Sequence, residues 1–127
     1  MKFFAMRKST LIGIVGPCGA GKSTLANNLI QEGYSVRHIA QEHSYVPSMW
    51  QRITNPDILI YLDVSYKKTI ARRSLNWTEG EYLEQIKRLQ HARQHADLYL
   101  DTNLLDQNGV FQAALAWLQH IIIYPDD

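Results

Sequence analysis

The stretch from Thr10 to Thr24 constrains the fold of this chain more than any other part of the sequence. Residues 10–15 form an apolar, β-branched run typical of a buried strand, and the residues that follow have the spacing G-x-x-x-x-G-K-[ST]. Glycines in such a loop allow successive backbone N–H groups to surround an anion, and the helix that follows adds the positive end of its dipole. The stretch therefore predicts a phosphate-binding loop, with an ordinary glycine turn that caps a helix as the alternative. The residues predicted to contact phosphate are Gly16, Pro17, Cys18, Gly19, Ala20, Gly21, Lys22, Ser23 and Thr24.

Two side chains of this loop are predicted to act on the ligand directly. Lys22 would neutralise the β- and γ-phosphates of a nucleoside triphosphate, and the hydroxyl of Ser23 would coordinate Mg²⁺. Cys18 is the only cysteine of the chain, which excludes an internal disulfide, and we interpret it as a small neutral filler of the loop.

Composition argues against several classes of protein. The apolar share of 46% and the charged share of 20% are those of an ordinary globular chain, and we expect residues 1–127 to form a single domain. The formal net charge is +1, so the basic excess of a nucleic-acid-binding protein is missing and no such partner is expected. No run is long and apolar enough to span a bilayer, and residues 1–6 are too short for a secretory signal. We therefore expect a cytoplasmic protein without a membrane partner.

The remaining pattern alternates strands with helices. Further strands are predicted at residues 34–40, 58–62 and 97–102, with helices after Lys22, Ser65, Thr78 and Gly109. The helix after Thr78 is expected to pack through a face that carries Tyr82, Ile86, Leu89 and Arg93. Alternation of this kind predicts an α/β fold with a mostly parallel sheet of about four strands. Because crossovers are right-handed, the strand order would be 2-1-3-4, and the phosphate loop would lie where the winding reverses.

Three stretches resemble the nucleoside-monophosphate-kinase-like P-loop kinases, the group of adenylate and thymidylate kinases. Residues 56–65 and the helix that follows them look like the strand and helix before the lid of these kinases. Residues 96–103 look like their last strand and adenine-side loop, and residues 16–24 resemble their Walker A phosphate loop. The resemblance implies a three-layer α/β/α P-loop NTPase fold with a short helical lid at about residues 72–93. It also implies a minimal enzyme that binds Mg·ATP and transfers the γ-phosphoryl group to a small acceptor.

The same resemblance implies roles for residues outside the loop. Arg72 stands where these kinases pack an arginine on adenine, and Thr102 and Asn103 stand in their adenine-side loop. Arg73, Arg88 and Arg93 are the possible counterparts of the lid arginines that reach the transferred phosphoryl group, because phosphoryl transfer requires neutralisation of spread negative charge. A solvated helix face, with Glu84 and Arg88 paired at i,i+4, is the alternative for the lid arginines.

The sequence departs from these kinases between residues 41 and 55. About a dozen residues stand where the family has another strand and most of its acceptor-binding insertion. This difference favours a second hypothesis, an ATP-hydrolysing switch or a nucleotide-binding module that acts through a protein partner. The identity of the acceptor or partner and the oligomeric state are left open.

Two acidic residues are candidates for the second protein ligand of Mg²⁺, beside Ser23. Asp63 directly follows an apolar strand, whereas Glu42 lies just beyond the strand expected on the other flank of the first. We favour Glu42, because its strand takes the place of the missing one. Glu42 or His43 could also orient an attacking water or hydroxyl, and a solvated loop is the alternative for both. No His/Cys spacing typical of a metal site occurs elsewhere.

Overall fold

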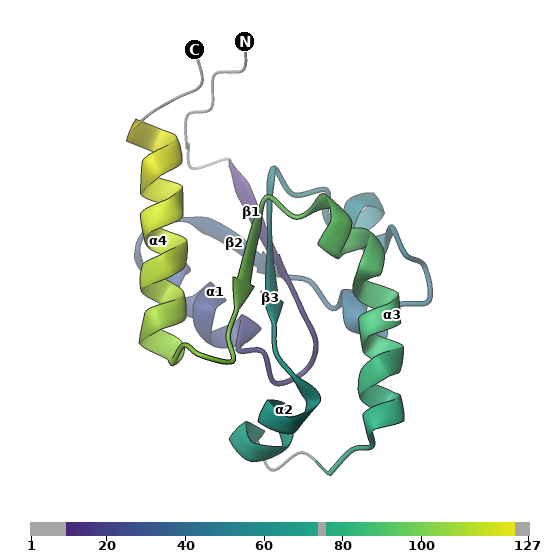
Figure 1. The fold of residues 1–127 in the computed structure, drawn as a ribbon. Coiled ribbons are helices and arrows are strands. Elements are labelled where there is room, and N and C mark those ends of the chain that lie inside the picture. Colours follow the sequence, from purple (N-terminus) through teal and green to yellow (C-terminus); the bar gives the residue numbers. More distant parts are fainter. Residues whose placement is uncertain (1–9, 74–75, 124–127) are drawn as a thin grey trace.

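A parallel sheet forms the centre of the fold, and it has the predicted strand order. The computed structural model describes residues 10–73 and 76–123. Its four strands are all parallel and lie in the order β2-β1-β3-β4 (Figure 1). The strands are β1 (Leu11–Val15), β2 (Ser35–His38), β3 (Ile58–Asp63) and β4 (Leu98–Asp101). The helices are α1 (Lys22–Gln31), α2 (Tyr66–Arg73), α3 (Glu79–His95) and α4 (Gln107–Ile123), with short helical turns η1 (Gln41–His43) and η2 (Trp50–Thr54).

Helices cover both faces of the sheet, which confirms the predicted three-layer α/β/α arrangement. α1 and α4 pack on one face and α3 covers the other (Figure 1). Strand β3 serves both layers, because Ile58, Ile60 and Leu62 belong to the core formed with α1 and α4, whereas Leu59 and Tyr61 belong to the core formed with α3. Alternate residues of a strand point to opposite faces, so a strand between two helical layers is apolar throughout.

Local signals set the ends of two helices. Gly33 follows the end of α1 with a φ of +100°, and the next N–H, that of Tyr34, donates to the carbonyl of Leu29 at 3.1 Å. This is the hydrogen bond expected when a left-handed residue ends a helix. At the start of α3, Thr78 and Glu81 form the reciprocal capping box that their spacing predicts.

Two helices differ from the prediction in detail. The buried face of α3 carries Leu89 as predicted, but Gln85 and Ala92 are buried in place of Ile86 and Arg93, because α3 packs against η1 as well as β3. α4 already contains Gly109, which the sequence places before the helix. Asp106 caps this helix by accepting a hydrogen bond from the N–H of Gly109 at 2.7 Å. Within the described part of the chain, none of the helices is both long and apolar enough to cross a membrane.

The parallel strands direct three segments to one edge of the sheet. The glycine-rich loop follows β1, η1 follows β2, and α2 follows β3, so all three leave the carboxyl ends of neighbouring strands. In Figure 1 this edge is the lower one, where α2 lies below β3. Open α/β sheets bind ligands at such an edge, where the winding reverses.

Candidate functional site

The glycine-rich loop makes a tight turn from β1 into α1. A Cβ on Gly16 would lie only 2.3 Å from the carbonyl oxygen of Leu62, so the ends of β1 and β3 approach as closely as a glycine allows. Gly21, the residue before α1, has a φ of +94°, a conformation that side chains other than glycine rarely adopt. The first N–H groups of an α-helix have no partner inside the helix, so those that start at Lys22 are directed toward the loop.

Lys22 folds back over this loop and is almost fully buried. Its ammonium group donates to the carbonyl oxygens of Gly16 at 2.7 Å and Pro17 at 3.1 Å. The same nitrogen lies 3.0 Å from Oε2 of Glu42, and only 5% of Lys22 is exposed. The side chain predicted to hold phosphate therefore sits inside the loop, with its charge balanced by one carboxylate.

Glu42 is the acid that the structure brings to the loop. It lies in η1, is 3% exposed and uses Oε2 for the ion pair with Lys22. Its other oxygen, Oε1, is buried and has no hydrogen-bond partner among the described residues. A buried carboxylate is stable only when its charge is compensated, so Lys22 and Glu42 depend on each other. The role of Glu42 as a metal ligand stays a prediction.

Gln41 holds the segment that carries Glu42 in place. It is fully buried, and its Oε1 accepts a hydrogen bond from the N–H of Trp50 at 2.8 Å. Its Nε2 donates to the carbonyl of Val46 at 2.9 Å and to that of Arg88 in α3 at 3.2 Å. One amide therefore links both parts of the 41–55 segment to α3. Sequence reasoning missed Gln41 because a glutamine in a polar stretch normally indicates a solvated loop.

Asp63 has a different set of partners. Its carboxylate accepts hydrogen bonds from the hydroxyl of Tyr99 and from the N–H of Val64, and it lies 4.0 Å from the guanidinium of Arg93. Burial and the hydrogen bond to Asp63 raise the pKa of Tyr99 to about 12. Within the described residues, no hydrogen bond or ion pair joins the Asp63 side chain to the loop.

Gln85 connects α3 to the loop and was missed from the sequence. Its Oε1 accepts a hydrogen bond from the N–H of Cys18 at 3.0 Å, and its Nε2 lies 3.2 Å from the Cys18 sulfur. The side chain is buried on the inner face of α3, in line with Leu89 and Ala92. A glutamine at i relative to buried residues at i+4 and i+7 is the signal that could have identified it, because buried amides need hydrogen-bond partners.

Two histidines lie at the mouth of the loop. Nδ1 of His38 is 3.4 Å from Oγ of Ser23, and burial together with the nearby Lys22 charge lowers the pKa of His38. His43 is more exposed, and its Nε2 lies 3.9 Å from the Cys18 sulfur. Both rings therefore stand beside residues of the predicted phosphate site.

Arg72, which the resemblance places beside adenine, forms hydrogen bonds with the segment that follows β4. Its guanidinium donates to Oγ1 of Thr102 at 3.0 Å, to the Thr102 carbonyl and to the carbonyl of Leu105 at 3.3 Å. Asn103 has a structural role in the same segment, since its Oδ1 accepts a hydrogen bond from the N–H of Ser65 at 2.9 Å. Arg72 and Thr102 are thus close together, as residues that line one site would be.

Arg88 lies on the opposite side of the loop, in α3. Its Nε is 3.7 Å from the carboxylate of Glu84, its Nη1 donates to the Glu42 carbonyl at 3.3 Å, and its guanidinium stacks over the ring of Tyr45. The i,i+4 pair with Glu84 that we gave as the alternative is therefore present. The side chain of Arg73 lies outside the part of the chain that the structure describes.

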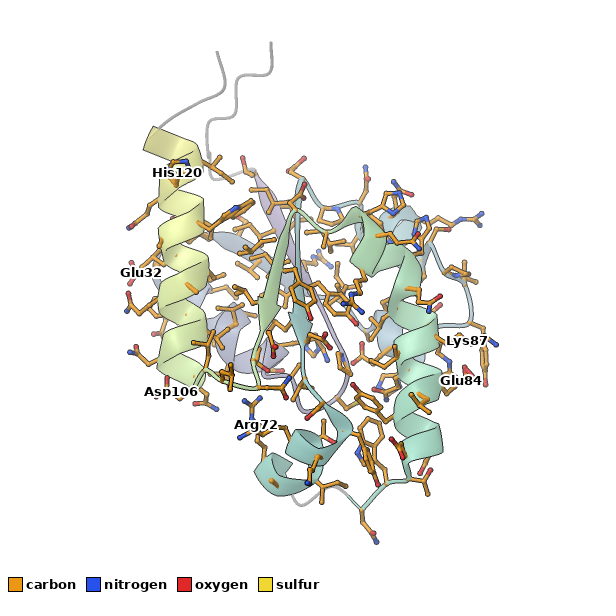
Figure 2. All side chains as sticks on the ribbon, viewed as in Figure 1. Glu32, Arg72, Glu84, Lys87, Asp106 and His120 are labelled. Atoms are coloured by element: carbon orange, nitrogen blue, oxygen red, sulfur yellow. The ribbon has the colours of Figure 1, made fainter. Side chains whose placement is uncertain are left out.

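A cavity of about 590 Å³ opens beside the loop. It lies between the loop, the start of α1, Arg72 of α2 and the start of α4, and Figure 2 shows Arg72 and Asp106 on either side of this region. Its volume is within the range of small-molecule sites. The lining residues are Gly19, Ala20, Gly21, Ser23, Thr24, Leu25, Arg72, Thr102, Leu105, Asp106, Gln107 and Val110.

Comparison with known proteins gives a weak structural similarity. No protein-family model and no curated protein matches the chain. Among solved structures, HP1043, an orphan response regulator of H. pylori, aligns over 92% of this chain and 99% of its own, with 10% identity and a TM-score of 0.39. This similarity is too low to transfer the function of that protein to this chain.

The expected membership in the nucleoside-monophosphate-kinase-like P-loop kinases is wrong on these comparisons, which name a response regulator and supply no family or curated match. The kinase-like phosphotransferase, the ATP-hydrolysing alternative and the class labels P-loop NTPase and Walker A are corrected with it. The physical reason is that a parallel sheet with helices on both faces serves many unrelated functions. A short loop motif on such a sheet therefore does not specify a family.

Proposed function

We propose that the loop of residues 16–24 is a binding site for the phosphate groups of a small ligand. A nucleoside triphosphate such as ATP, accompanied by Mg²⁺, is the ligand that the residues favour. The observation that carries the proposal is the buried ammonium group of Lys22, 3.0 Å from Glu42 and enclosed by the loop carbonyls. Because Glu42 already compensates this buried charge, the support for an anionic ligand comes from the position of the ammonium group beside a glycine-rich loop and the free N–H groups at a helix N-terminus.

Each residue near the loop has a part in this proposal. The N–H groups at the start of α1 and the ammonium of Lys22 would contact phosphate oxygens. The hydroxyl of Ser23 and the carboxylate of Glu42 would bind Mg²⁺, which prefers oxygen ligands. When phosphate replaces Glu42 as the partner of Lys22, the cation would take over the charge of Glu42. The remainder of the ligand would occupy the cavity beside Arg72 and Thr102.

The proposal concerns binding and includes no transfer of a phosphoryl group. A cytoplasmic location belongs to the proposal as well, because ATP is abundant there. A protein partner and self-association stay predictions.

Titration calorimetry with ATP and with pyrophosphate, each with and without Mg²⁺, tests the proposal. Lys22→Ala should weaken binding of both ligands about 100-fold, because hydrogen bonds to charged groups contribute about 1.5–3 kcal/mol. Lys87→Ala, which removes an exposed lysine of α3, is the matched control and should bind as the wild type does. Equal affinity of the Lys22 variant and the wild type, or equal affinity for ATP and adenosine, would contradict the proposal.

Ser23→Ala provides a second test that does not disturb the core, since Ser23 is exposed. It should weaken ATP binding about tenfold in the presence of Mg²⁺ and leave binding without Mg²⁺ nearly unchanged. An equal loss under both conditions would show that the hydroxyl does not act through the cation.

A further inference from the structure

Three side chains with metal-binding atoms meet at the mouth of the loop. The sulfur of Cys18, a carboxylate oxygen of Glu42 and a ring nitrogen of His43 all lie within 4.8 Å of one another. Nε2 of His43 is 3.9 Å from the Cys18 sulfur and 3.9 Å from Oε2 of Glu42. Cys18 is 25 residues from His43 in the sequence, so no local spacing motif indicates this group.

Glu42 supplies an observation that itself points to a ligand. The residue is 97% buried (3% exposed), and Oε1 has no hydrogen-bond partner among the described residues. Oε2 is already held by Lys22 at 3.0 Å. A buried carboxylate oxygen without a partner is unfavourable, and a cation bound there would satisfy it while Lys22 keeps the other oxygen.

We infer that Cys18, Glu42 and His43 form a binding site for a soft divalent transition-metal ion, of which Zn²⁺ is the best representative. A thiolate, an imidazole and a carboxylate are the ligands that Zn²⁺ uses in proteins, whereas Mg²⁺ and Ca²⁺ do not take sulfur. In a tetrahedral zinc site, sulfur and imidazole nitrogen are about 3.6 Å apart, and nitrogen and oxygen about 3.4 Å apart. The Cys18–His43 separation of 3.9 Å approaches the first value. The 3.9 Å from His43 to Glu42 is measured to Oε2, the oxygen that Lys22 also holds, so the His43 side chain, which is 60% exposed, would shift to bring its ring nitrogen to the unpartnered Oε1.

The exposure of His43 also leaves room for a water molecule as the fourth ligand, the arrangement of zinc sites with three protein ligands. Binding forms a zinc–sulfur bond and breaks the S–H bond of Cys18, and the proton passes to solvent. No oxidant or reductant is required. The site shares the Glu42 carboxylate with the Mg²⁺ position proposed above, so the two cations would compete for it, but its sulfur and imidazole ligands belong to this site alone.

Metal titration of the full chain in the absence of nucleotide and phosphate tests the inference. Competition with a chromophoric chelator should give one Zn²⁺ per chain, and Co²⁺ should produce a thiolate-to-cobalt charge-transfer band. Cys18→Ser should abolish this band and weaken Zn²⁺ binding about 100-fold or more, and His43→Ala should weaken Zn²⁺ binding by a similar factor. His95→Ala, which removes an exposed histidine from α3, is the matched control and should retain the band and the affinity.

Absence of stoichiometric Zn²⁺ binding to the wild type overturns the inference. So does Zn²⁺ binding that is equal in the wild type and in the Cys18 and His43 variants, or that is lost in the His95 variant. Because the titration contains no phosphate, each of these results leaves the calorimetric test of the phosphate site unaffected. Conversely, failure of ATP and pyrophosphate to bind leaves the zinc titration interpretable.

Discussion

Two carboxylates follow the strands on either side of β1, and their surroundings differ. Glu42, which follows β2, is buried and forms an ion pair with Lys22. Asp63, which ends β3, is more exposed and accepts hydrogen bonds from Tyr99 and from its own neighbouring backbone. Both acids lie at the carboxyl edge of the sheet, so their position along the strands does not distinguish them.

The difference shows that the orientation of a side chain at this edge depends on what packs around the strand end. The turn that carries Glu42 is held against α3 by the amide of Gln41. The end of β3 is flanked by β4, and the phenol of Tyr99 reaches Asp63 across that pair of strands. An apolar run followed by an acid therefore predicts a location at the edge, and neighbouring segments select the partner.

Substitution of Glu42 is the most direct test of the difference between the two acids. Glu42→Gln should lower the free energy of unfolding by about 3 kcal/mol, because Lys22 then stays buried without a counter-charge. Urea unfolding followed by circular dichroism measures this change. The double variant Lys22→Met with Glu42→Leu should lose less than the sum of the two single variants, since it removes both charges together. A loss for Glu42→Gln no larger than that for Asp63→Asn would contradict the distinction.

Asp63→Asn should have a smaller effect, about 1 kcal/mol in the same urea experiment. The carboxylate is only partly buried, and an amide oxygen in its place can still accept the hydrogen bond from Tyr99. The same variant should bind ATP and pyrophosphate as the wild type does, because, among the described residues, no hydrogen bond or ion pair joins the Asp63 side chain to the loop. A large loss of ligand binding in this variant would indicate that Asp63 takes part in the site, and it would contradict the preference for Glu42 as the acid that binds Mg²⁺.

The smallest expected effect concerns His38, beside Ser23. Burial and the Lys22 charge lower its pKa in the folded chain, whereas the unfolded chain has the ordinary value of about 6.5. As the pH falls through 6.5, the unfolded chain binds more protons than the folded chain, so this histidine makes unfolding easier. Relative to His38→Gln, the wild type should lose stability between pH 7 and pH 5.5 and show a constant difference above pH 7. If the wild type instead became more stable relative to His38→Gln at low pH, the lowered pKa of His38 would be contradicted.

Much of the fold was predictable because its signals are local. The apolar run of β3 predicts a strand buried on both faces, Gly33 predicts a helix end, and Thr78 with Glu81 predicts a helix start. Right-handed crossovers then determine the strand order. The buried faces of the helices were predicted less accurately. The inner face of α3 packs against η1, a segment whose sequence has no clear helix or strand pattern.

The candidate site also has one part that the sequence predicts and another that only the structure shows. The glycine-rich loop proposed to bind phosphate is recognisable from glycine and lysine spacing, since its geometry involves consecutive residues. The choice of Glu42 as the acid beside Lys22 was a preference between two residues, and only the packed structure shows which of them contacts the lysine. The family was misassigned because the loop and the sheet order are shared by proteins with different functions.

By itself, the sequence determined the strands, their order and the loop, since each follows from neighbouring residues or from the handedness of connections. Tertiary structure decided which side chains meet at the loop. Gln85 binds Cys18 across 67 positions, and the carboxylate of Glu42 meets the ammonium group of Lys22 through the placement of η1, which packs against α3. Such contacts depend on the relative placement of whole helices, and hydrogen-bond and ion-pair geometry changes over distances of less than an ångström.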